Sequence, residues 1–239
     1  MSEYETVEGL AATFDLDEAQ AIALERYVDA VLAWPGNVSA LRRREEVVAT
    51  LLGDALALLD VPRLRASAGA WLDLGTGAGV PGVPLAVACP NAELTLLEAA
   101  SRKCAFLREA VRVAGLERRS RVVCERSEGH AALGKPGREA YQIVLARAVT
   151  ALPALLELAS PLLETGGVLL ASKTASAVAR EGPGAERVAA LCGLTAGPVV
   201  PLVRSPLQDS VCAVYEKVAT TPPGLPRRPG MAVKRPLGG

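Results

Sequence analysis

The amino-acid sequence predicts an α/β fold built on a seven-stranded, mostly parallel sheet whose last strand is antiparallel, with a helical extension in front. Three observations predict this class. Apolar, strand-like runs alternate with helix-like segments after about residue 69, which is typical of a parallel sheet covered by helices on both faces. A glycine-rich stretch links the first strand to the first helix. Two β-rich runs at residues 199–203 and 211–216 are joined by a short connection, which indicates a hairpin.

Residues 1–68 are predicted to form a helical extension packed on the main domain. Residues 15–18 offer capping side chains to a helix whose apolar residues recur at helical spacing, and residues 34–37, Trp-Pro-Gly-Asn, end it. Six aliphatic residues at the same spacing predict a second helix over about residues 43–60. Pro62 and the small residues that follow it separate this extension from the first strand.

The main domain is predicted over residues 69–219, followed by a basic, Pro/Gly-rich tail over residues 220–239 that has no core of its own. Strands are expected at 70–74, 93–97, 120–124, 142–145, 168–172, 199–203 and 211–216. Helices are expected at 101–114, with Ser101 as its cap, and at 129–133, 152–163 and 175–191, with a turn at 164–167 and a weak break at 182–184.

Charge is balanced over the 239 residues but unevenly distributed. The formal net charge is zero, so the overall charge does not indicate a nucleic-acid-binding protein. Residues 1–60 carry twelve acidic residues against four arginines, whereas residues 101–126 carry eight basic residues against three acidic ones. From Arg204 to the end there are six basic and two acidic residues. This asymmetry predicts one electropositive side; the alternative is that solvated helix faces carry these charges without a partner.

Cysteine usage and the apolar segments point to a cytoplasmic protein. The five cysteines are odd in number and never spaced as Cys-x-x-Cys, so the sequence predicts neither a zinc site nor a disulfide framework; they are Cys89, Cys104, Cys124, Cys192 and Cys212. The acidic N-terminus has no apolar core of a signal peptide, and charged residues or proline interrupt the longer apolar stretches. We therefore expect a protein without a membrane span. As a separate expectation, the chain is a monomer.

The glycine-rich stretch carries the most specific signal. Gly75, Gly77, Gly79 and Gly82 fall within eight residues, between an apolar strand and a helix start. Only a residue without a Cβ adopts positive φ freely and lets a ligand lie against the main chain, while the helix start presents unpaired N–H groups. The stretch predicts a nucleotide-like ligand.

Two cofactors and a plain structural turn compete for this loop. Residues 77–82 match the dinucleotide fingerprint, and Glu98 lies about twenty residues on, where a ribose ligand is expected, so NAD is a rival. However, Asp73 at the strand end would repel a pyrophosphate. The spacing of Asp73, Gly75, Gly77 and Gly79 instead fits a ligand with an amino group and a sulfonium, as in S-adenosylmethionine. The Glu98 carboxylate serves either ribose.

Three more strand ends carry candidate site residues. Residues 126–128, Arg-Ser-Glu, follow the third strand and can face an adenine through Ser127 and Glu128; alternatively, Glu128 caps the next helix. Arg147 directly follows a buried strand, where it would bind a cofactor carboxylate or an RNA phosphate, or else form a structural ion pair. Lys173 ends the next strand and has the same alternatives. His130, the only histidine, is interpreted as a surface or capping residue.

These residues resemble a known family. Residues 73–86, Asp-Leu-Gly-Thr-Gly-Ala-Gly-Val-Pro-Gly-Val-Pro-Leu-Ala, resemble the signature loop of the bacterial small-subunit rRNA guanine-N7 methyltransferases, also called glucose-inhibited division protein B. The prolines make this loop more specific than a general methyltransferase loop. The resemblance covers about residues 20–237 and continues at residues 37–41, 97–98, 103–107, 126–128, 146–148 and 226–237.

The resemblance implies a class I S-adenosylmethionine-dependent methyltransferase of the Rossmann-like type. It implies cofactor contacts at Gly75, Val80, Ser127, Glu128 and Arg147, with Glu98 on the ribose. It also implies that the chain methylates N7 of a guanine in the decoding-region loop of 16S rRNA, within the small ribosomal subunit or its precursor. Guanine N7 carries no proton, so the reaction needs no general base, and nothing in the sequence predicts a Ser-His-Asp or metal mechanism. Arg147 and Lys173 are the candidate catalytic residues.

The sequence departs from the family pattern at three places. Leu51 stands where the family usually has a histidine, three residues before Asp54. Thr174 replaces the glycine of a Lys-Gly pair, and Asp209-Ser210 replaces an Arg-His pair. These departures leave two other hypotheses open. The chain could methylate another RNA or a small molecule, or it could bind S-adenosylmethionine or RNA without catalysis.

Overall fold

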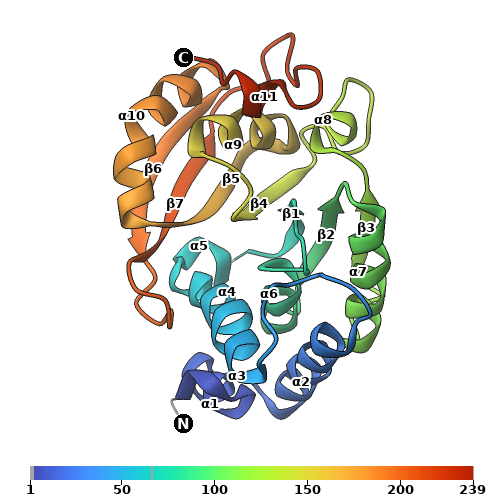
Figure 1. Ribbon diagram of the computed structural model, residues 1–239. Coiled ribbons are helices and arrows are strands. Elements are labelled where there is room, and N and C mark those ends of the chain that lie inside the picture. The colour runs from blue at the N-terminus through green and yellow to red at the C-terminus, as the bar shows by residue number, and fades with distance from the viewer. Residues whose placement is uncertain (1–2, 66, 239) are drawn as a thin grey trace.

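A seven-stranded sheet crosses the computed structural model, which describes residues 3–65 and 67–238 (Figure 1). The strands are β1 (Gly69–Leu74), β2 (Ala92–Glu98), β3 (Ser120–Cys124), β4 (Tyr141–Arg147), β5 (Leu163–Thr174), β6 (Leu194–Pro201) and β7 (Ser210–Lys217). Their order is β3-β2-β1-β4-β5-β7-β6, and β7 runs in the direction opposite to the other six described strands. The predicted fold class and the terminal hairpin are confirmed.

Helices cover both faces of this sheet (Figure 1). Helices α1 to α5 precede β1, and the remaining six follow it in order. They are α1 (Val7–Phe14), α2 (Glu18–Ala33), α3 (Arg44–Val47), α4 (Asp54–Leu56), α5 (Pro62–Arg65), α6 (Gly82–Ala88), α7 (Ser101–Val113), α8 (Ser127–His130), α9 (Leu152–Ala159), α10 (Ala175–Leu191) and α11 (Met231–Lys234). None of the helices within the described residues is long and apolar enough to cross a membrane.

Two apolar clusters, one on each face, hold the layers together. Because successive strand residues point to opposite faces, Trp71 packs with α2, α6 and α7, whereas Leu72 packs with α9 and α10. In β4, Ile143 packs in the same cluster as Trp71, and Val144 packs in the same cluster as Leu72. The first cluster also contains apolar residues of α1, α3 and α4, so the N-terminal helices share a core with the sheet.

The N-terminal helices follow the predicted signals, and the structure adds elements that were not predicted. Asp17 caps α2 by accepting from the Gln20 N–H at 2.8 Å, and the Gln20 side chain accepts from the Asp17 N–H in return. The predicted second helix is helical throughout, but a π-helical segment over Val48–Gly53 separates α3 from α4 and a 3-10 turn over Ala57–Asp60 closes it. Helices α1 and α5 were not predicted from the sequence.

Several local predictions in the main domain are wrong. Helix α8 covers Ser127–His130 rather than 129–133, α9 ends at Ala159 rather than at 163, and β6 covers Leu194–Pro201 rather than 199–203. Residues 164–167 belong to β5 rather than to a turn; a Cβ at Gly167 would lie 2.9 Å from the main-chain oxygen of Tyr141, so glycine lets the two strands approach. Helix α10 continues through Pro183 because Ala185, Val188 and Ala189 are buried against the domain. Ala100, not Ser101, occupies the N-cap of α7, and no side chain bonds there.

The C-terminal tail, which is predicted to have no core of its own, is docked on the main domain. Leu225 is buried in the same cluster as α9 and α10, and its main-chain oxygen accepts from Arg138 at 2.9 Å. Arg227 forms a two-point ion pair with Glu157, which is 2% exposed. Helix α11 packs on α9 (Figure 1). The tail therefore reaches the carboxyl edge of the sheet.

Candidate cofactor site

A cavity of about 230 Å³ opens at the carboxyl ends of β1, β2 and β3. Its walls come from the residues that end these strands, from the segment after β4, and from the C-terminal tail. Ligands of open α/β sheets bind at this edge, where the loops after the strands converge. This cavity is therefore the candidate cofactor site.

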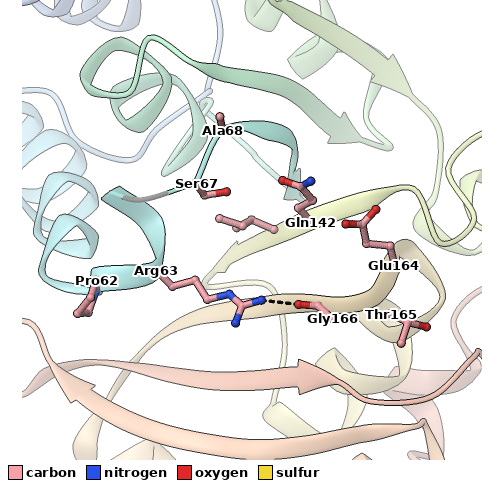
Figure 2. A pocket seen from close by; sticks show the side chains of 9 residues that line it. Pro62, Arg63, Ser67, Ala68, Gln142, Glu164, Thr165 and Gly166 are labelled. Atoms are coloured by element: carbon pink, nitrogen blue, oxygen red, sulfur yellow. Dashed lines mark hydrogen bonds between the residues drawn. The ribbon is translucent and has the colours of Figure 1, made fainter.

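A larger cavity lies at the opposite edge. It measures about 680 Å³ and is lined by α5 and by residues at the amino ends of β1, β4 and β5. Figure 2 shows Arg63 reaching across it to the main-chain oxygen of Gly166, with Gln142 and Glu164 beside them. Size alone does not make it the site, because no strand of a parallel sheet ends there and no loop after a strand contributes to it.

The glycine loop borders the candidate site, which Gly75 lines, and has the conformation that its sequence predicts. Gly75, Gly77 and Gly79 have φ of 66°, 59° and 90°, in the left-handed region. A Cβ at Gly79 would meet Val83 at 2.9 Å, so that glycine is required for packing. A Cβ at Gly77 would meet only the Gly75 main-chain oxygen, at 4.0 Å. Gly77 thus faces open space.

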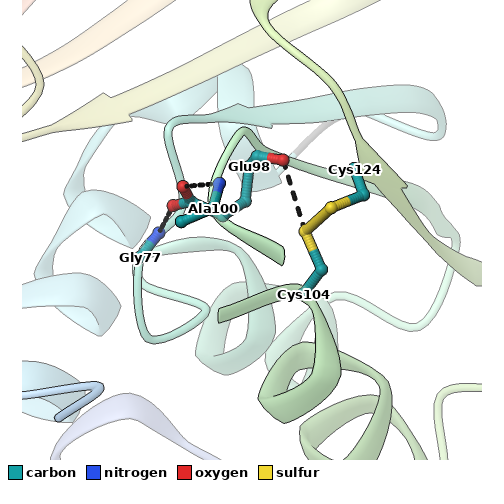
Figure 3. Close-up of a disulfide and its surroundings, with 5 residues drawn as sticks. All are labelled: Gly77, Glu98, Ala100, Cys104 and Cys124. Atoms are coloured by element: carbon teal, nitrogen blue, oxygen red, sulfur yellow. Dashed lines mark hydrogen bonds between the residues drawn. A yellow bond between two sulfur atoms is a disulfide. The ribbon is translucent and has the colours of Figure 1, made fainter. Parts of the chain in front are cut away.

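Glu98 is fixed at the end of β2 by two main-chain donors. Its Oε2 accepts from the Gly77 N–H at 3.1 Å, and its Oε1 accepts from the Ala100 N–H at 2.9 Å (Figure 3). The residue is 9% exposed and lines the cavity. The carboxylate is thus oriented by the loop it faces, with lone pairs left to accept from a bound hydroxyl.

Ser127 and Glu128 line the opposite wall and are joined to the tail. Ser127 Oγ lies 3.2 Å from Glu128 Oε2, and Glu128 Oε1 accepts from the Gly230 N–H at 2.7 Å. Both residues are nearly buried. Glu128 does not cap α8, which begins one residue before it with no side-chain cap. Gly230 and Val233 of the C-terminal tail complete this wall, although neither was a candidate cofactor residue.

Asp73 lies behind the loop instead of lining the cavity. It is fully buried, and its Oδ2 accepts from Thr76 Oγ1 at 2.5 Å and from the Gly82 N–H at 2.8 Å. Burial raises the pKa of Asp73 to about 6, although the Thr76 and Gly82 hydrogen bonds and the charge of Arg147 act in the opposite direction. Its Oδ1 has no hydrogen-bond partner among the described residues. Asp73 holds the loop in shape.

The N-terminal extension supports the same loop from below. Tyr27 of α2 is buried and donates its hydroxyl to the Ala78 main-chain oxygen at 2.7 Å. Burial, followed by the Asp73 charge, raises the pKa of Tyr27 well above its ordinary value, so the hydroxyl stays protonated. Val80 is 6% exposed and packs in the first apolar cluster, with its N–H donated to the Thr76 oxygen at 3.1 Å.

Arg147 ends β4 and forms an ion pair with the extension. Its Nε lies 2.7 Å from Asp54 Oδ2, and its Nη2 donates to the Thr50 main-chain oxygen at 2.9 Å. Asp54 is 2% exposed, and its other oxygen accepts from Ser205 at 2.8 Å and Ser210 at 3.0 Å. Asp54 therefore connects the extension, β4 and the β6–β7 hairpin, a role the sequence did not reveal.

Lys173 forms a second ion pair on the other face of the sheet. Its Nζ lies 3.0 Å from Glu181 Oε2 of α10 and donates to the Thr150 oxygen at 2.7 Å. Because Arg147 pairs with Ser172 in the sheet register, the next residue, Lys173, points to the opposite face. The two basic residues do not converge, and neither lines the 230 Å³ cavity.

His130 is a buried residue rather than a surface or capping one. It is 4% exposed, and its Nε2 lies 2.7 Å from the Tyr141 hydroxyl. Burial lowers the pKa of His130, an effect that the nearby Glu125 carboxylate partly opposes. His130 packs away from the cavity and joins α8 to β4.

The expectation of unpaired cysteines is wrong for one pair. Cys104 in α7 and Cys124 at the end of β3 form a disulfide, with Cα atoms 5.9 Å apart (Figure 3). The twenty-residue separation hides the pair in the sequence, but β3 lies beside β2 and α7 packs against β3. Cys89, Cys192 and Cys212 are free.

The residues at this edge fit S-adenosylmethionine. Gly77 leaves room for a ligand against the main chain, and Glu98 offers an oriented carboxylate to a ribose. Ser127 and Glu128 form a polar wall on the far side, where an adenine edge can be bound. Of the sequence-predicted set, Gly75, Glu98, Ser127 and Glu128 line the cavity, and Gly77 is hydrogen-bonded to Glu98 beside it.

Comparison with protein families gives one match that spans most of the chain. The family model for GidB, rRNA small subunit methyltransferase G, matches residues 20–199. A ribosomal RNA small subunit methyltransferase G from Stenotrophomonas maltophilia is 41% identical over 170 residues, which cover 70% of this chain and 76% of the relative. Another from Alkaliphilus metalliredigens is 32% identical over 235 residues, covering 94% and 93%.

Solved structures agree on the fold. The S-adenosylmethionine-dependent methyltransferase SibL superposes with a TM-score of 0.57 at 18% identity, covering 89% of this chain and 73% of that one. A protein from Corynebacterium glutamicum gives a TM-score of 0.52 at 20% identity, covering 88% and 94%. These identities support the class I methyltransferase fold and no finer conclusion.

Proposed function

This chain belongs to the GidB family, rRNA small subunit methyltransferase G, and we propose that it methylates N7 of a guanine in the decoding-region loop of 16S rRNA. It is a methyltransferase whose cofactor is S-adenosylmethionine. The substrate would be the small ribosomal subunit or its precursor. The observation that carries the proposal is the family match across residues 20–199, which includes the whole carboxyl edge from β1 to β5.

The cofactor-binding residues would be those that the structure places at the β1–β3 edge. The loop from Gly75 to Gly79 would bind the methionine part, with Asp73 and Val80 fixing its shape from behind. Glu98 would accept both ribose hydroxyls, and Ser127 with Glu128 would bind the adenine edge. When bound, S-adenosylmethionine supplies an electrophilic methyl group on a sulfonium.

The chain has little proton chemistry to perform in this reaction. N7 of guanine has a lone pair and no proton, so no side chain has to act as a general base. Holding two reactants in line can lower a barrier by roughly 7–11 kcal/mol. The residues therefore act by orientation, and Asp73, with its pKa near 6 and its buried position, serves the loop and not proton transfer.

Arg147 and Lys173 would act on the substrate side of the edge. Asp54 fixes the guanidinium of Arg147 through Nε, and Thr50 fixes Nη2. The remaining nitrogen, Nη1, donates no hydrogen bond within residues 3–65 and 67–238 and would be directed to the cofactor carboxylate or to a phosphate. Lys173 is bound to Glu181 and Thr150, so we assign it the smaller contribution.

The departures from the family pattern occupy explained positions in this structure. Leu51 packs in the first apolar cluster. Thr174 caps α10 by accepting from the Ala177 N–H at 3.2 Å. Ser210 donates to Asp54, so the serine takes part in the network that holds Arg147. We infer that these changes adjust the substrate side and leave the cofactor side intact.

Deletion of the gene tests the proposal. N7-methylguanine in the small-subunit rRNA is mapped by chemical cleavage in three strains. These are the wild type, the deletion strain, and the deletion strain that carries the gene on a plasmid. We expect one cleavage product to disappear on deletion and to return with the plasmid. Persistence of every N7-methylguanine would refute the proposal. Methylation of a metabolite by the purified chain, or cofactor binding without transfer to any RNA, would then identify one of the two alternatives.

A further inference from the structure

The disulfide lies at the rim of the cofactor site. Cys124 is the last residue of β3 and the register partner of Glu98, and it precedes Ser127 by three residues. Cys104 lies in the first turns of α7, which begins just after the Ala100 that binds Glu98. The disulfide therefore links the segment after Glu98, the residue proposed to bind the ribose, to the segment before Ser127 and Glu128, which are proposed to bind the adenine (Figure 3).

Cys104 also contacts Glu98 directly. Its Sγ lies 3.3 Å from the Glu98 main-chain oxygen, which accepts from the Glu125 N–H at 3.0 Å as well. A thiol at this position has a proton to donate to that oxygen, whereas a disulfide sulfur has none. Conversion between the two states therefore changes the hydrogen bonding of the residue whose carboxylate faces the cofactor.

The two cysteine residues differ in exposure. Cys104 is fully buried, whereas Cys124 lies on the surface beside the exposed Arg126. Thiol–disulfide exchange proceeds by attack of a thiolate on an accessible sulfur. Attack on this pair is thus directed to Cys124, with Cys104 as the leaving group.

We propose that Cys104 and Cys124 form a thiol–disulfide exchange site through which small thiols such as glutathione set the affinity of the chain for S-adenosylmethionine. The thiolate of one glutathione attacks Cys124 Sγ, the Cys104–Cys124 bond breaks, and the Cys104 sulfur leaves and takes up a proton. A second glutathione then attacks the mixed disulfide. The protein disulfide is reduced to two thiols, and two glutathione molecules are oxidised to one disulfide.

The closed pair favours cofactor binding because it holds both walls in the bound arrangement. In the reduced chain, the β2–α7 and β3–α8 segments are joined only by noncovalent contacts, and binding must order them. The proposal rests on the cofactor site and is independent of which RNA is the substrate. It can fail while the rRNA activity stands, and the reverse also holds.

Calorimetry with S-adenosylhomocysteine tests the affinity. The oxidised chain, prepared with glutathione disulfide, is expected to bind about tenfold more tightly than the chain reduced with dithiothreitol, an effect in the range that preorganisation provides. The Cys104→Ala/Cys124→Ala variant should bind like the reduced chain under both conditions. Cys89→Ala, which removes a partly buried free cysteine elsewhere, should keep the full difference. Equal affinity of oxidised and reduced wild type would overturn the proposal.

Linkage supplies a second readout that a merely structural disulfide would not move. If oxidation raises the affinity by some factor, saturating S-adenosylhomocysteine must shift the exchange equilibrium with glutathione by the same factor. The oxidised fraction is measured by thiol alkylation and mass spectrometry across a series of glutathione ratios. An equilibrium that does not respond to the ligand contradicts the proposal, even if the disulfide raises the melting temperature.

The order of attack is tested with single variants. Cys104→Ala should accumulate a glutathione adduct on the exposed Cys124. Cys124→Ala should leave the buried Cys104 unmodified in the folded chain. Adducts forming on Cys104 instead, at a comparable rate, would contradict the direction of exchange and with it the proposed site.

Discussion

The β1–β3 edge and the β4–β7 edge of the same sheet are built in different ways. At the first, the main chain provides the organisation: Gly77 and Ala100 hold Glu98, and Gly230 holds Glu128. At the second, charged side chains from distant segments pair, with Asp54 and Arg147 separated by 93 residues. One edge is shaped by glycine geometry and the other by ion pairs.

This difference teaches where each edge is vulnerable. The first edge should lose its ligand when a side chain enters the space above the loop, while the fold persists. The second edge should lose stability when one partner of a buried pair is removed, because the other charge remains without compensation.

Gly77→Val should abolish cofactor binding. Its side chain would occupy the open space that the structure leaves above the loop. We expect the affinity for S-adenosylmethionine to fall by about a hundredfold or more, because a preformed site cannot rearrange easily to avoid the clash. Calorimetric titration measures it. The matched control is Gly134→Val, whose φ of 76° imposes the same backbone strain with nothing within 4 Å. Unchanged affinity in Gly77→Val would remove the loop from the site.

Arg147→Ala should destabilise the fold and reduce methyl transfer. The change leaves Asp54 buried without its countercharge, which we expect to cost about 3 kcal/mol in the free energy of unfolding. Urea denaturation gives this value, and single-turnover assays give the transfer rate. Arg112→Ala, at an exposed ion pair, should leave both unchanged. If Arg147→Ala keeps wild-type turnover while losing stability, Arg147 is structural alone.

Asp73 should give a pH dependence that an asparagine removes. Burial raises its pKa from 3.8 to about 6, so the folded chain binds this proton more tightly than the unfolded chain. Its contribution to stability is complete below its ordinary pKa and is lost as the pH rises through about 6, by about 3 kcal/mol in all. The free energy of unfolding of wild type relative to Asp73→Asn should fall by that amount between about pH 3 and pH 7. If this difference in the free energy of unfolding does not change with pH, the pKa of Asp73 is not raised in the folded chain.

Lys173→Met should have the smallest effect of this set. The Glu181 carboxylate would still accept a hydrogen bond from the Leu152 N–H at 2.8 Å, so its negative charge would remain partly stabilised. We expect a loss of about 1–2 kcal/mol in the free energy of unfolding, below that of Arg147→Ala, with a smaller decrease in methyl transfer. Urea denaturation and the transfer assay measure both. A larger loss of transfer than Arg147→Ala would make Lys173 the principal basic residue of the substrate edge.

The sequence predicts the fold well where patterns are local. The alternation of strands and helices, the glycine loop and the Asp17 cap depend on near neighbours along the chain, and the structure confirms them. Packing decides the rest. Helix α10 runs through Pro183 because Ala185, Val188 and Ala189 beyond it are buried, and residues 164–167 belong to β5, where Gly167 lies against Tyr141.

The site divides along the same line. Gly77 and Glu98 could be assigned from spacing because the loop and the next strand end form one supersecondary unit. Asp54, Gly230 and the Cys104–Cys124 pair could not be, since each meets the site only after segments far apart in the chain have packed. Arg147 shows the limit most clearly: its strand-end position predicts a special environment, but the sequence does not reveal that Asp54 provides it.

The central claim is that this cofactor edge supports methylation of small-subunit rRNA, and reconstitution tests it most directly. The purified chain is incubated with methyl-labelled S-adenosylmethionine and small ribosomal subunits from the deletion strain, beside the Gly77→Val variant. We predict label at N7 of a single guanine in the decoding-region loop with wild type and none with the variant. Absence of label in the RNA, label at another atom, or equal labelling by Gly77→Val would contradict the account.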